Sequence, residues 1–436
     1  MAEIAHTHGE KMGCWDNAMD GIAGWNSSSF DSFDSFDSIP MHGGRALRYY
    51  VVALHYLRSM VTIASSGRRR RLSRPLGRVA LLSTATVIVL IVGKFNIRLL
   101  RQFAATDHSH NRRKFAIMGG TGMQGGAAID LLLESGISPS NIRTLTRNAS
   151  SPAAKILSAE KGIEVVEGSQ DIGNVEDSDY IQKVEELKSA YSQLLHGAEC
   201  VFALTFTQYD DGTREKRLGK ILFESIAASP SVKMVVFSGG ERTGIHLLDA
   251  KADIEEIGLQ VLKSTGIQCV FLHSSFFMEN ILIKGKHKRY RLLSAKHYEL
   301  SLPLPIDRRI AMISARDIGN VAGKILLNRF SEDSGQQFDS FQVVGDIVSP
   351  QSFLQSVKTS LPEFEFDYRQ THFDELKEAM GEAQATLVRQ MYETYYSQNS
   401  DEAITRERIK QTNKIYPGTA DIGQWVDKYA QNILAS

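Results

Sequence analysis

One short segment, residues 114–136, limits the folds open to this chain more than any other. It reads KFAIMGGTGMQGGAAIDLLLESG: an apolar run, a glycine-rich turn, and then an amphipathic stretch with helical spacing. Gly119, Gly122 and Gly125 form a GxxGxxG pattern, and Gly120 in place of Gly119 also satisfies GxGxxG. GxGxxG alone is weak evidence, but a strand before it and a helix after it are the context that supports a ligand-binding loop.

The physical properties of such a loop point to a phosphate-bearing ligand. Glycines permit a tight turn and a close approach of the backbone to the ligand, and the following helix presents free N–H groups and the positive end of its dipole. We therefore expect the pyrophosphate of a dinucleotide to lie on the loop from Gly119 to Gly126. A purely structural glycine turn is the alternative.

From residue 114 onward, short apolar runs alternate with longer amphipathic stretches, which is typical of a parallel sheet covered by helices. The expected strands are Phe115–Met118, Ile142–Thr146, Ile163–Val166, Cys200–Thr205, Lys233–Ser238 and Cys269–His273. The expected helices lie near 123–135, 152–161, 178–195, 213–229 and 249–265. The pattern predicts an α/β fold: a doubly wound parallel Rossmann sheet over 114–275 and a smaller C-terminal α/β lobe over 276–436, which would serve a substrate or partner. Ser349-Pro350 is expected to open a helix in that lobe.

The N-terminal part of the chain has a different composition. Residues 1–44 contain three Phe-Asp-Ser repeats without helical or strand periodicity, and we expect a disordered leader. Residues 45–113 hold 14 Lys and Arg against one acidic residue, whereas residues 114–436 hold 35 against 42. Within this basic segment, the run 76–97 is apolar and long enough to span a membrane if charged residues at its ends reach the interface.

Three interpretations of the basic segment remain open at this point. It is a membrane anchor, an organelle-targeting segment, or the product of a start codon assigned too far upstream. The body is expected to be cytoplasmic, anchored or targeted by this segment. The run Arg68–Arg71 lies beside apolar residues, which favours lipid over nucleic acid, and no nucleic-acid partner is expected.

The cysteines argue against disulfides and metal sites. Cys14, Cys200 and Cys269 are far apart and show no metal-ligand spacing. Cys200 and Cys269 lie in strand-like apolar runs, so buried free thiols in a reducing compartment are expected.

The second predicted strand distinguishes between two dinucleotides. NAD-specific folds place an acidic residue at its end to bind the ribose 2′-hydroxyl. No acidic residue occurs from Ser135 to Ala159, and the strand ends at Arg147, which could contact a 2′-phosphate through two parallel hydrogen bonds. The cofactor is therefore predicted to be NADP(H). The alternative is that Arg147 is a solvated loop cation.

Several ordered segments resemble the NmrA-like family, an atypical branch of the short-chain dehydrogenase/reductase superfamily. They are the glycine loop with its Gln124, TRNASSPAAKIL (146–157), HLLDAKADIEE (246–256), FLHSSFFMENIL (271–282) and ISARDIGNVAGKIL (313–326). The resemblance extends over about residues 114–432.

The resemblance implies a set of cofactor contacts. For the pyrophosphate and 2′-phosphate they are Gly119, Gly120, Thr121, Gly122, Met123, Gln124 and Arg147. For adenine and its ribose they are Ser169, Gln170, Thr205, Phe206 and Thr207, and for the nicotinamide end Lys251, Phe277, Glu279 and Asn280. One departure is Ser169, because the superfamily commonly has Asp directly after the glycine at 168. The adenine contacts are therefore less well defined than the others.

The catalytic residues of the superfamily are incomplete. None of the 14 tyrosines precedes a lysine by four positions, and the residue four before Lys251 is Leu247, which carries no proton. The favoured hypothesis is thus an NADP(H)-binding redox sensor or regulator that contacts a protein partner. The alternative is an NADPH-dependent reductase of a small carbonyl or enone substrate with Lys251 as the catalytic proton donor.

Other polar and aromatic residues are interpreted as structural. Ser238 is expected to be a polar strand end, and His273 to be held by a hydrogen bond. Tyr392, Tyr395 and Tyr396 recur at helical spacing, which indicates a packed helix face.

Overall fold

The computed structural model describes residues 113–206, 212–282, 290–328, 337–398 and 401–434. The chain divides into two units, and all of these residues belong to the second, residues 97–436. The predicted leader and the apolar run 76–97 lie outside the described residues. No helix in the described ranges is both long and apolar enough to cross a membrane.

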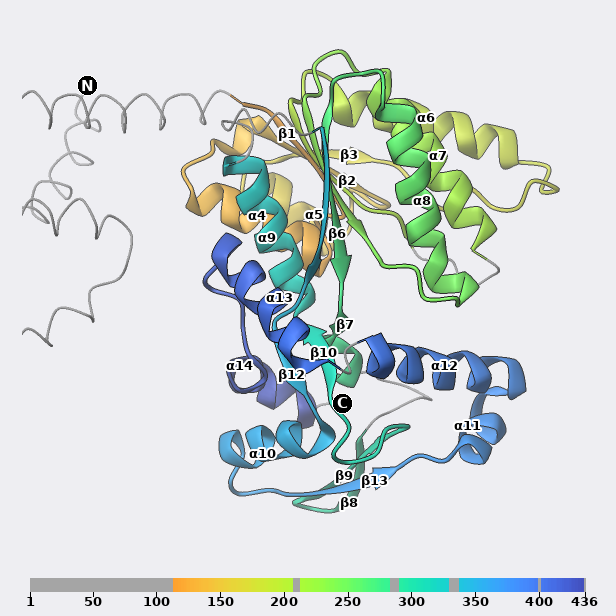
Figure 1. Ribbon diagram of the computed structural model, residues 1–436. Helices are drawn as coiled ribbons and strands as arrows, with labels where there is room; N and C mark the ends of the chain where they lie inside the picture. Colours follow the sequence, from red (N-terminus) through yellow and green to blue (C-terminus); the bar gives the residue numbers. More distant parts are fainter. Residues whose placement is uncertain (1–112, 207–211, 283–289, 329–336, 399–400, 435–436) are drawn as a thin grey trace, which may run out of the picture. The chain divides into compact units, whose positions relative to one another are not determined.

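Seven strands, each parallel to its neighbours, form the central sheet in the order β11-β6-β5-β4-β1-β2-β3 (Figure 1). They are β1 (Phe115–Met118), β2 (Ile142–Thr146), β3 (Glu164–Glu167), β4 (Cys200–Ala203), β5 (Met234–Gly239), β6 (Gln268–Ser274) and β11 (Phe338–Val343). The strand order reverses between β1 and β4, and the carboxyl ends of strands at such a point border the crevice where ligands bind. The doubly wound parallel Rossmann sheet predicted from the sequence is confirmed.

Six of these strands were expected from their apolar runs, and their ends differ from the expected ones by no more than two residues. The seventh, β11, was not predicted. Its sequence, FDSFQV, is partly polar, and it pairs with β6 alone at the edge of the sheet. A strand with one neighbour has less need of a continuous apolar run than a buried one.

Side chains of β1 point alternately to the two faces of the sheet. Phe115 and Ile117 belong to one apolar core, and Ala116 and Met118 belong to the other. Helices α4 and α9 cover the first face, and α6, α7 and α8 cover the second (Figure 1). Their bounds are α4 (Met123–Glu134), α6 (Tyr180–Leu195), α7 (Thr213–Ala227), α8 (His246–Leu262) and α9 (Ala315–Asn328). The expected helix near 152–161 consists of a short α5 (Pro152–Lys155) and a π-helical turn, η3 (Ile156–Glu160). A short 3-10 turn, η2 (Pro139–Asn141), leads into β2.

A second lobe contains two small sheets, in the orders β12-β10-β7 and β13-β9-β8. The strands are β7 (Phe276–Phe277), β8 (Tyr290–Ser294), β9 (His297–Leu302), β10 (Ile310–Ile313), β12 (Asp346–Val348) and β13 (Glu365–Gln370). The helices are the 3-10 helix η4 (Met278–Leu282), α10 (Pro350–Ser360), α11 (Phe373–Met380), α12 (Glu382–Gln398), α13 (Glu402–Ile415) and α14 (Ile422–Leu434). They enclose a third apolar core around Trp425, Phe353 and Phe366.

After residue 275, the path of the chain passes back and forth between the two lobes. Helix α9 and strand β11 belong to the Rossmann layer, and Ile415 at the end of α13 packs against the same core as α9. Arg316 of α9 also forms an ion pair with Asp130 of α4 at 2.9 Å. Some segments after residue 275 therefore belong to the Rossmann layer, and the second lobe is not one continuous stretch of the chain.

Two local predictions are confirmed in this body. The Ser349 hydroxyl accepts a hydrogen bond from the Ser352 backbone N–H at 3.1 Å and caps α10. Tyr392 and Tyr395 of α12 pack against Phe276, with ring centroids 5.3 and 5.4 Å away.

Of the cysteines, Cys200 and Cys269 are buried free thiols, as expected. Burial raises the pKa of Cys200 to about 12.

Candidate cofactor site

The glycine loop connects β1 to α4 at the carboxyl edge of the sheet. Gly119 has a φ of +65°, a left-handed conformation that favours glycine, and its carbonyl accepts a hydrogen bond from the Gly122 N–H at 2.8 Å. A Cβ atom at Gly125 would lie 2.3 Å from the Gly119 carbonyl oxygen and 2.4 Å from that of Met118. The helix therefore starts directly against the turn, and a side chain at Gly125 would force them apart.

The N-terminus of α4 has the features of an anion site. No side chain caps Gly122, the residue before the helix, so the first N–H groups of α4 remain available to a ligand. Thr121, Gly122 and Met123 are exposed, whereas Gly120 is buried. The side-chain oxygen of Gln124 is buried without a hydrogen-bond partner in the described part of the chain. The uncapped N–H groups of α4 fit a bound pyrophosphate, whereas the amide oxygen of Gln124 accepts hydrogen bonds and could pair only with a donor such as a ligand hydroxyl.

Thr144 supports the loop from the neighbouring strand β2. Its hydroxyl donates to the Ile117 carbonyl at 2.6 Å and accepts from the Gly120 N–H at 3.1 Å. The sequence analysis did not single out this residue. The signal was a threonine in the middle of the second strand, IRTLT, whose hydroxyl faces the loop once β1 and β2 pair.

Arg147 and Phe206 come together at the carboxyl ends of β2 and β4. The guanidinium carbon of Arg147 lies 5.6 Å from the centroid of the Phe206 ring, and Phe206 is 51% exposed. Within the described ranges, no carboxylate forms an ion pair with Arg147. The structure thus places an exposed cation on an exposed aromatic ring beside the glycine loop, while Thr207 lies outside the described residues.

Gln170 links the segment after β3 to the end of β4. Its amide nitrogen donates to the Tyr191 hydroxyl and the Leu204 carbonyl, both at 3.1 Å, and its oxygen accepts from the Phe206 N–H at 3.1 Å. Ser169 accepts a hydrogen bond from the Asp171 N–H at 3.1 Å. Gln170 therefore helps to hold Phe206 in place.

Lys251 of α8 belongs to a hydrogen-bonded network with Thr205 and Glu215. Its ammonium lies 2.8 Å from the Thr205 carbonyl oxygen, 2.9 Å from the Thr205 hydroxyl and 2.6 Å from a Glu215 carboxylate oxygen. The Glu215 side chain is fully buried, and its other oxygen has no partner among the described residues. An ammonium has three N–H donors, so each donor of Lys251 has a protein acceptor.

Glu215 is a residue that the sequence analysis missed. It lies in the first turn of α7 within a highly charged stretch, TREKR, where a carboxylate is usually solvated. Only the packing of α7 against α8 places it beside Lys251.

The residues expected at the nicotinamide end are spread over β7 and η4. Phe277 and Asn280 are half-buried. The Glu279 carboxylate accepts hydrogen bonds from the Ser314 hydroxyl at 2.8 Å, the Ala315 N–H at 2.9 Å and the Trp425 indole N–H at 3.2 Å. These contacts give Glu279 a structural role, because they join η4 to the start of α9 and to α14.

Two further polar residues are placed as expected. Ser238 is buried near the end of β5. A ring nitrogen of His273 lies 2.6 Å from the Glu255 carboxylate, which confirms the interpretation of this histidine as hydrogen-bonded.

Known proteins share this fold and parts of this sequence. The NmrA-like oxidoreductase lnaB of Aspergillus flavus is 29% identical over 192 residues, which are 40% of this chain and only half of that relative. The crystal structure of NmrA, a negative transcriptional regulator, in complex with NAD aligns with a TM-score of 0.56 at 16% identity, and its NADP complex with 0.55 at 15%. Each alignment covers 74% of this chain and 95% of NmrA.

A reductase shares the same fold. The Citrobacter sp. triphenylmethane reductase complexed with NADP(H) aligns with a TM-score of 0.54 at 15% identity, over 73% of this chain and all of that enzyme. At this level of identity, the structural similarities establish the fold alone. The profile of the NmrA-like family matches residues 111–426. On this match, together with the Rossmann sheet and its glycine loop, the chain belongs to the NmrA-like family.

Proposed function

We propose that this protein binds NADP(H) and acts as a redox sensor or regulator. Support for a dinucleotide comes from the tight turn at Gly119 and Gly125 and from the uncapped N-terminus of α4. NmrA in complex with NAD or NADP, and the reductase with NADP(H), share this fold. A bound NADPH would supply a hydride; the residues of the glycine loop would hold its pyrophosphate.

A preference for NADP(H) over NAD(H) is supported by Arg147. The residue follows β2, where an acidic residue would favour the ribose 2′-hydroxyl, and it is exposed over Phe206. A guanidinium held on a ring keeps its edge N–H groups available for a phosphate.

The contacts of Lys251 are the reason why we favour sensing over catalysis. A lysine that donates a proton to a substrate needs an N–H that is free to point at that substrate. All three donors of Lys251 have acceptors on Thr205 and Glu215, and its side chain is only 19% exposed. In this arrangement Lys251 positions the end of β4 and the start of α7.

The cofactor preference is tested by titrating the full chain with NADPH and with NADH. We expect Arg147→Ala to weaken NADPH binding about 10- to 100-fold, corresponding to the loss of charged hydrogen bonds, and to leave NADH binding nearly unchanged. Arg291→Ala, which changes an exposed arginine in the second lobe, is the control and should leave both affinities unchanged. Equal affinity of the unaltered protein for the two cofactors would contradict the preference.

Reductase activity is the second candidate, because the Aspergillus flavus relative is named an oxidoreductase and Lys251 lies in the same network as Thr205. It is tested by incubating the full chain with NADPH and a panel of small carbonyl and enone compounds. Cofactor oxidation that is lost in Lys251→Ala and retained in Lys220→Ala would establish the reductase, provided that both variants still bind NADPH.

A redox sensor must also meet a second requirement, which concerns its two cofactor complexes. The NADPH and NADP⁺ complexes must differ in conformation or dynamics. We expect different amide hydrogen exchange in the two complexes, and identical exchange would contradict the sensor.

A further inference from the structure

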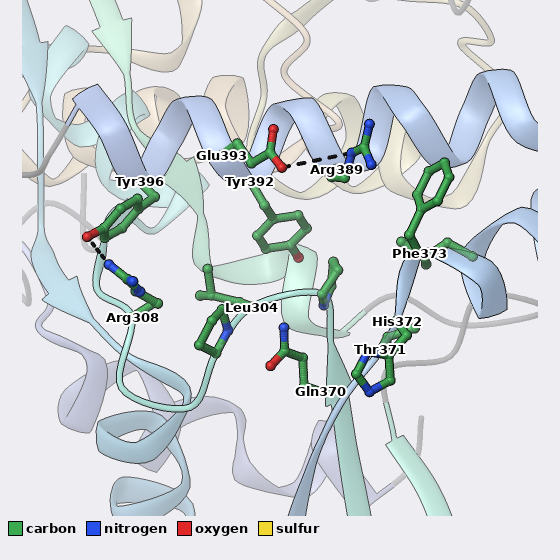
Figure 2. A pocket seen from close by; sticks show the side chains of 13 residues that line it. Leu304, Arg308, Gln370, Thr371, His372, Phe373, Arg389, Tyr392, Glu393 and Tyr396 are labelled. Carbon is green, nitrogen blue, oxygen red and sulfur yellow. Dashed lines mark hydrogen bonds and ion pairs between the residues drawn. The ribbon is translucent and has the colours of Figure 1, made fainter.

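A second cavity, of about 340 Å³, lies within the second lobe (Figure 2). Its lining comes from the segment after β9, from the end of β13 with the start of α11, and from one face of α12. None of the residues predicted to contact the cofactor lines it. Its volume lies within the range of about 300–1,000 Å³ that is typical of small-molecule sites.

The inner wall of this cavity is apolar and partly aromatic. Leu304, Leu376 and Tyr392 are buried, and Phe373 is half-buried beside them. Tyr392 projects from α12 between the two ends of the cavity (Figure 2). These surfaces suit a flat apolar ligand of modest size.

The rim carries two arginines, each placed over an aromatic ring. The guanidinium carbon of Arg308 lies 4.5 Å from the centroid of Tyr396, and that of Arg389 lies 4.4 Å from the centroid of Phe373. Arg308 also donates one N–H to the Tyr396 hydroxyl. A guanidinium held flat on a ring keeps other edge N–H groups available to a planar anion.

These two cations are incompletely neutralised by protein carboxylates. Within the described residues, Arg308 forms no ion pair with a carboxylate, and it is exposed. Arg389 pairs with Glu393 one helical turn away, at a distance of 3.8 Å, and both side chains are largely exposed. Such a long, solvated pair stabilises little. Arg308, Arg389 and Glu393 together leave the rim with one net positive charge.

We propose that this cavity binds a small aromatic monocarboxylate, with its ring against Tyr392 and its carboxylate at Arg308, the arginine that forms no ion pair within the described residues. A planar carboxylate matches the paired N–H groups of a guanidinium. The single net charge of the rim matches one negative charge, and Glu393 opposes the second charge of a phosphate ester. The ligand would occupy the second lobe independently of the cofactor.

The test is isothermal titration of the full chain with sodium 2-naphthoate, and with 2-naphthamide as its uncharged counterpart. We expect one site for 2-naphthoate and at least tenfold weaker binding of 2-naphthamide. Arg308→Gln should weaken naphthoate binding about tenfold, whereas Arg389→Gln, at the other end of the cavity, should weaken it less. Arg309→Gln is the matched control, because the adjacent Arg309 pairs with Glu402 and does not line the cavity.

A variant that should tighten binding distinguishes a direct effect on the ligand from misfolding, which would only weaken binding. Glu393→Gln removes the only carboxylate among the residues that line the cavity, so it should tighten naphthoate binding severalfold. All variants should keep the far-ultraviolet circular dichroism of the unaltered protein. The proposal is overturned if naphthoate does not bind, if naphthamide binds equally well, or if Arg308→Gln does not weaken binding.

Saturation with NADPH separates this cavity from the cofactor site. We expect 2-naphthoate to bind in the presence of NADPH, and displacement by NADPH would assign it to the cofactor crevice and overturn the proposal. Because NADPH binding is measured on its own, failure of the cofactor proposal would remain distinguishable from failure of this one.

Discussion

The crevice at the glycine loop and the cavity under α12 provide for a ligand in different ways. In the crevice, the backbone of β1 and α4 sets the shape, and Lys251 is held by the buried carboxylate of Glu215. In the cavity, two exposed arginines, Arg308 and Arg389, lie on aromatic rings that come from other segments of the chain. The shape of the crevice therefore depends on backbone atoms, which a substitution does not remove. The binding groups of the cavity are side chains, and each can be replaced by a single substitution.

The largest expected difference concerns Gly125 of the crevice and a helical glycine of the second lobe that lies outside the cavity. In Gly125→Ala, the new methyl group meets backbone oxygens at 2.3 and 2.4 Å, so the turn and the helix must separate. We expect a loss of about 3 kcal/mol or more in the free energy of unfolding, as for overpacked core sites, and loss of measurable NADPH binding.

Gly423→Ala in α14 is the comparison for this substitution. Its nearest neighbour would be a side-chain oxygen of Asp421 at 3.3 Å, and alanine favours a helix by about 1 kcal/mol over glycine. We expect unchanged or slightly increased stability and unchanged NADPH affinity. Urea denaturation and cofactor titration measure both effects, and a similar loss in the two variants would remove the distinction between the regions.

The next largest difference concerns one ion pair from each region. Lys251→Met leaves the fully buried Glu215 carboxylate without its cation, and removing one member of a buried pair costs about 3–5 kcal/mol. Arg389→Met breaks an exposed pair at 3.8 Å and should cost no more than about 0.5 kcal/mol.

The double variant Lys251→Met/Glu215→Gln should recover part of the stability lost in Lys251→Met, because it removes the unpaired charge. Denaturant unfolding of the single and double variants gives these values. If Lys251→Met lowers the free energy of unfolding as little as Arg389→Met does, the ion pair with Glu215 does not hold Lys251 in place. The argument for sensing over catalysis would then fail.

The smallest expected effect is a pH dependence at the helix pair beneath the crevice. Burial acts to raise the pKa of Asp130, but hydrogen bonds and charges from Lys161 and Arg316 outweigh it, and the pKa is lowered. A lowered pKa in the folded state contributes stability that is complete above the unfolded-state pKa and is lost as the pH falls through the folded value.

Asp130→Asn should therefore reduce stability by about 0.5–1 kcal/mol at neutral pH, the range of partly exposed ion pairs, and the difference should shrink below about pH 4, near the unfolded-state pKa. In the second lobe, hydrogen bonding from Arg406 lowers the pKa of the exposed Glu402 in the same direction. Glu402→Gln should show a smaller effect with the same sign. Thermal unfolding across pH measures both, and a difference for Asp130→Asn that grows as the pH falls would contradict the direction.

Several parts of the fold could be predicted from the sequence because their signals are local. The strand at Phe115–Met118, the glycine turn and α4 follow one another within a single short segment, and each has a pattern set by backbone geometry. The N-cap at Ser349 is equally local. The position of Arg147 directly after β2 followed from the predicted second strand, Ile142–Thr146.

Other features depend on residues far apart in the chain. β11 takes its place beside β6 from a separation of more than 60 residues, and its partly polar sequence carries no strong strand signal. Glu279 has the sequence context of a cofactor contact, yet its carboxylate accepts hydrogen bonds from Ser314, Ala315 and Trp425. The three segments around the second cavity share no motif.

The sequence by itself thus determined the Rossmann sheet and the glycine loop, because backbone hydrogen bonding and apolar periodicity act over neighbouring residues. Only the tertiary structure decided that Lys251 is held by Thr205 and Glu215 and that Arg308 and Arg389 share one cavity. The physical reason is that the packing of helices and sheets decides which distant polar side chains meet and whether water reaches them.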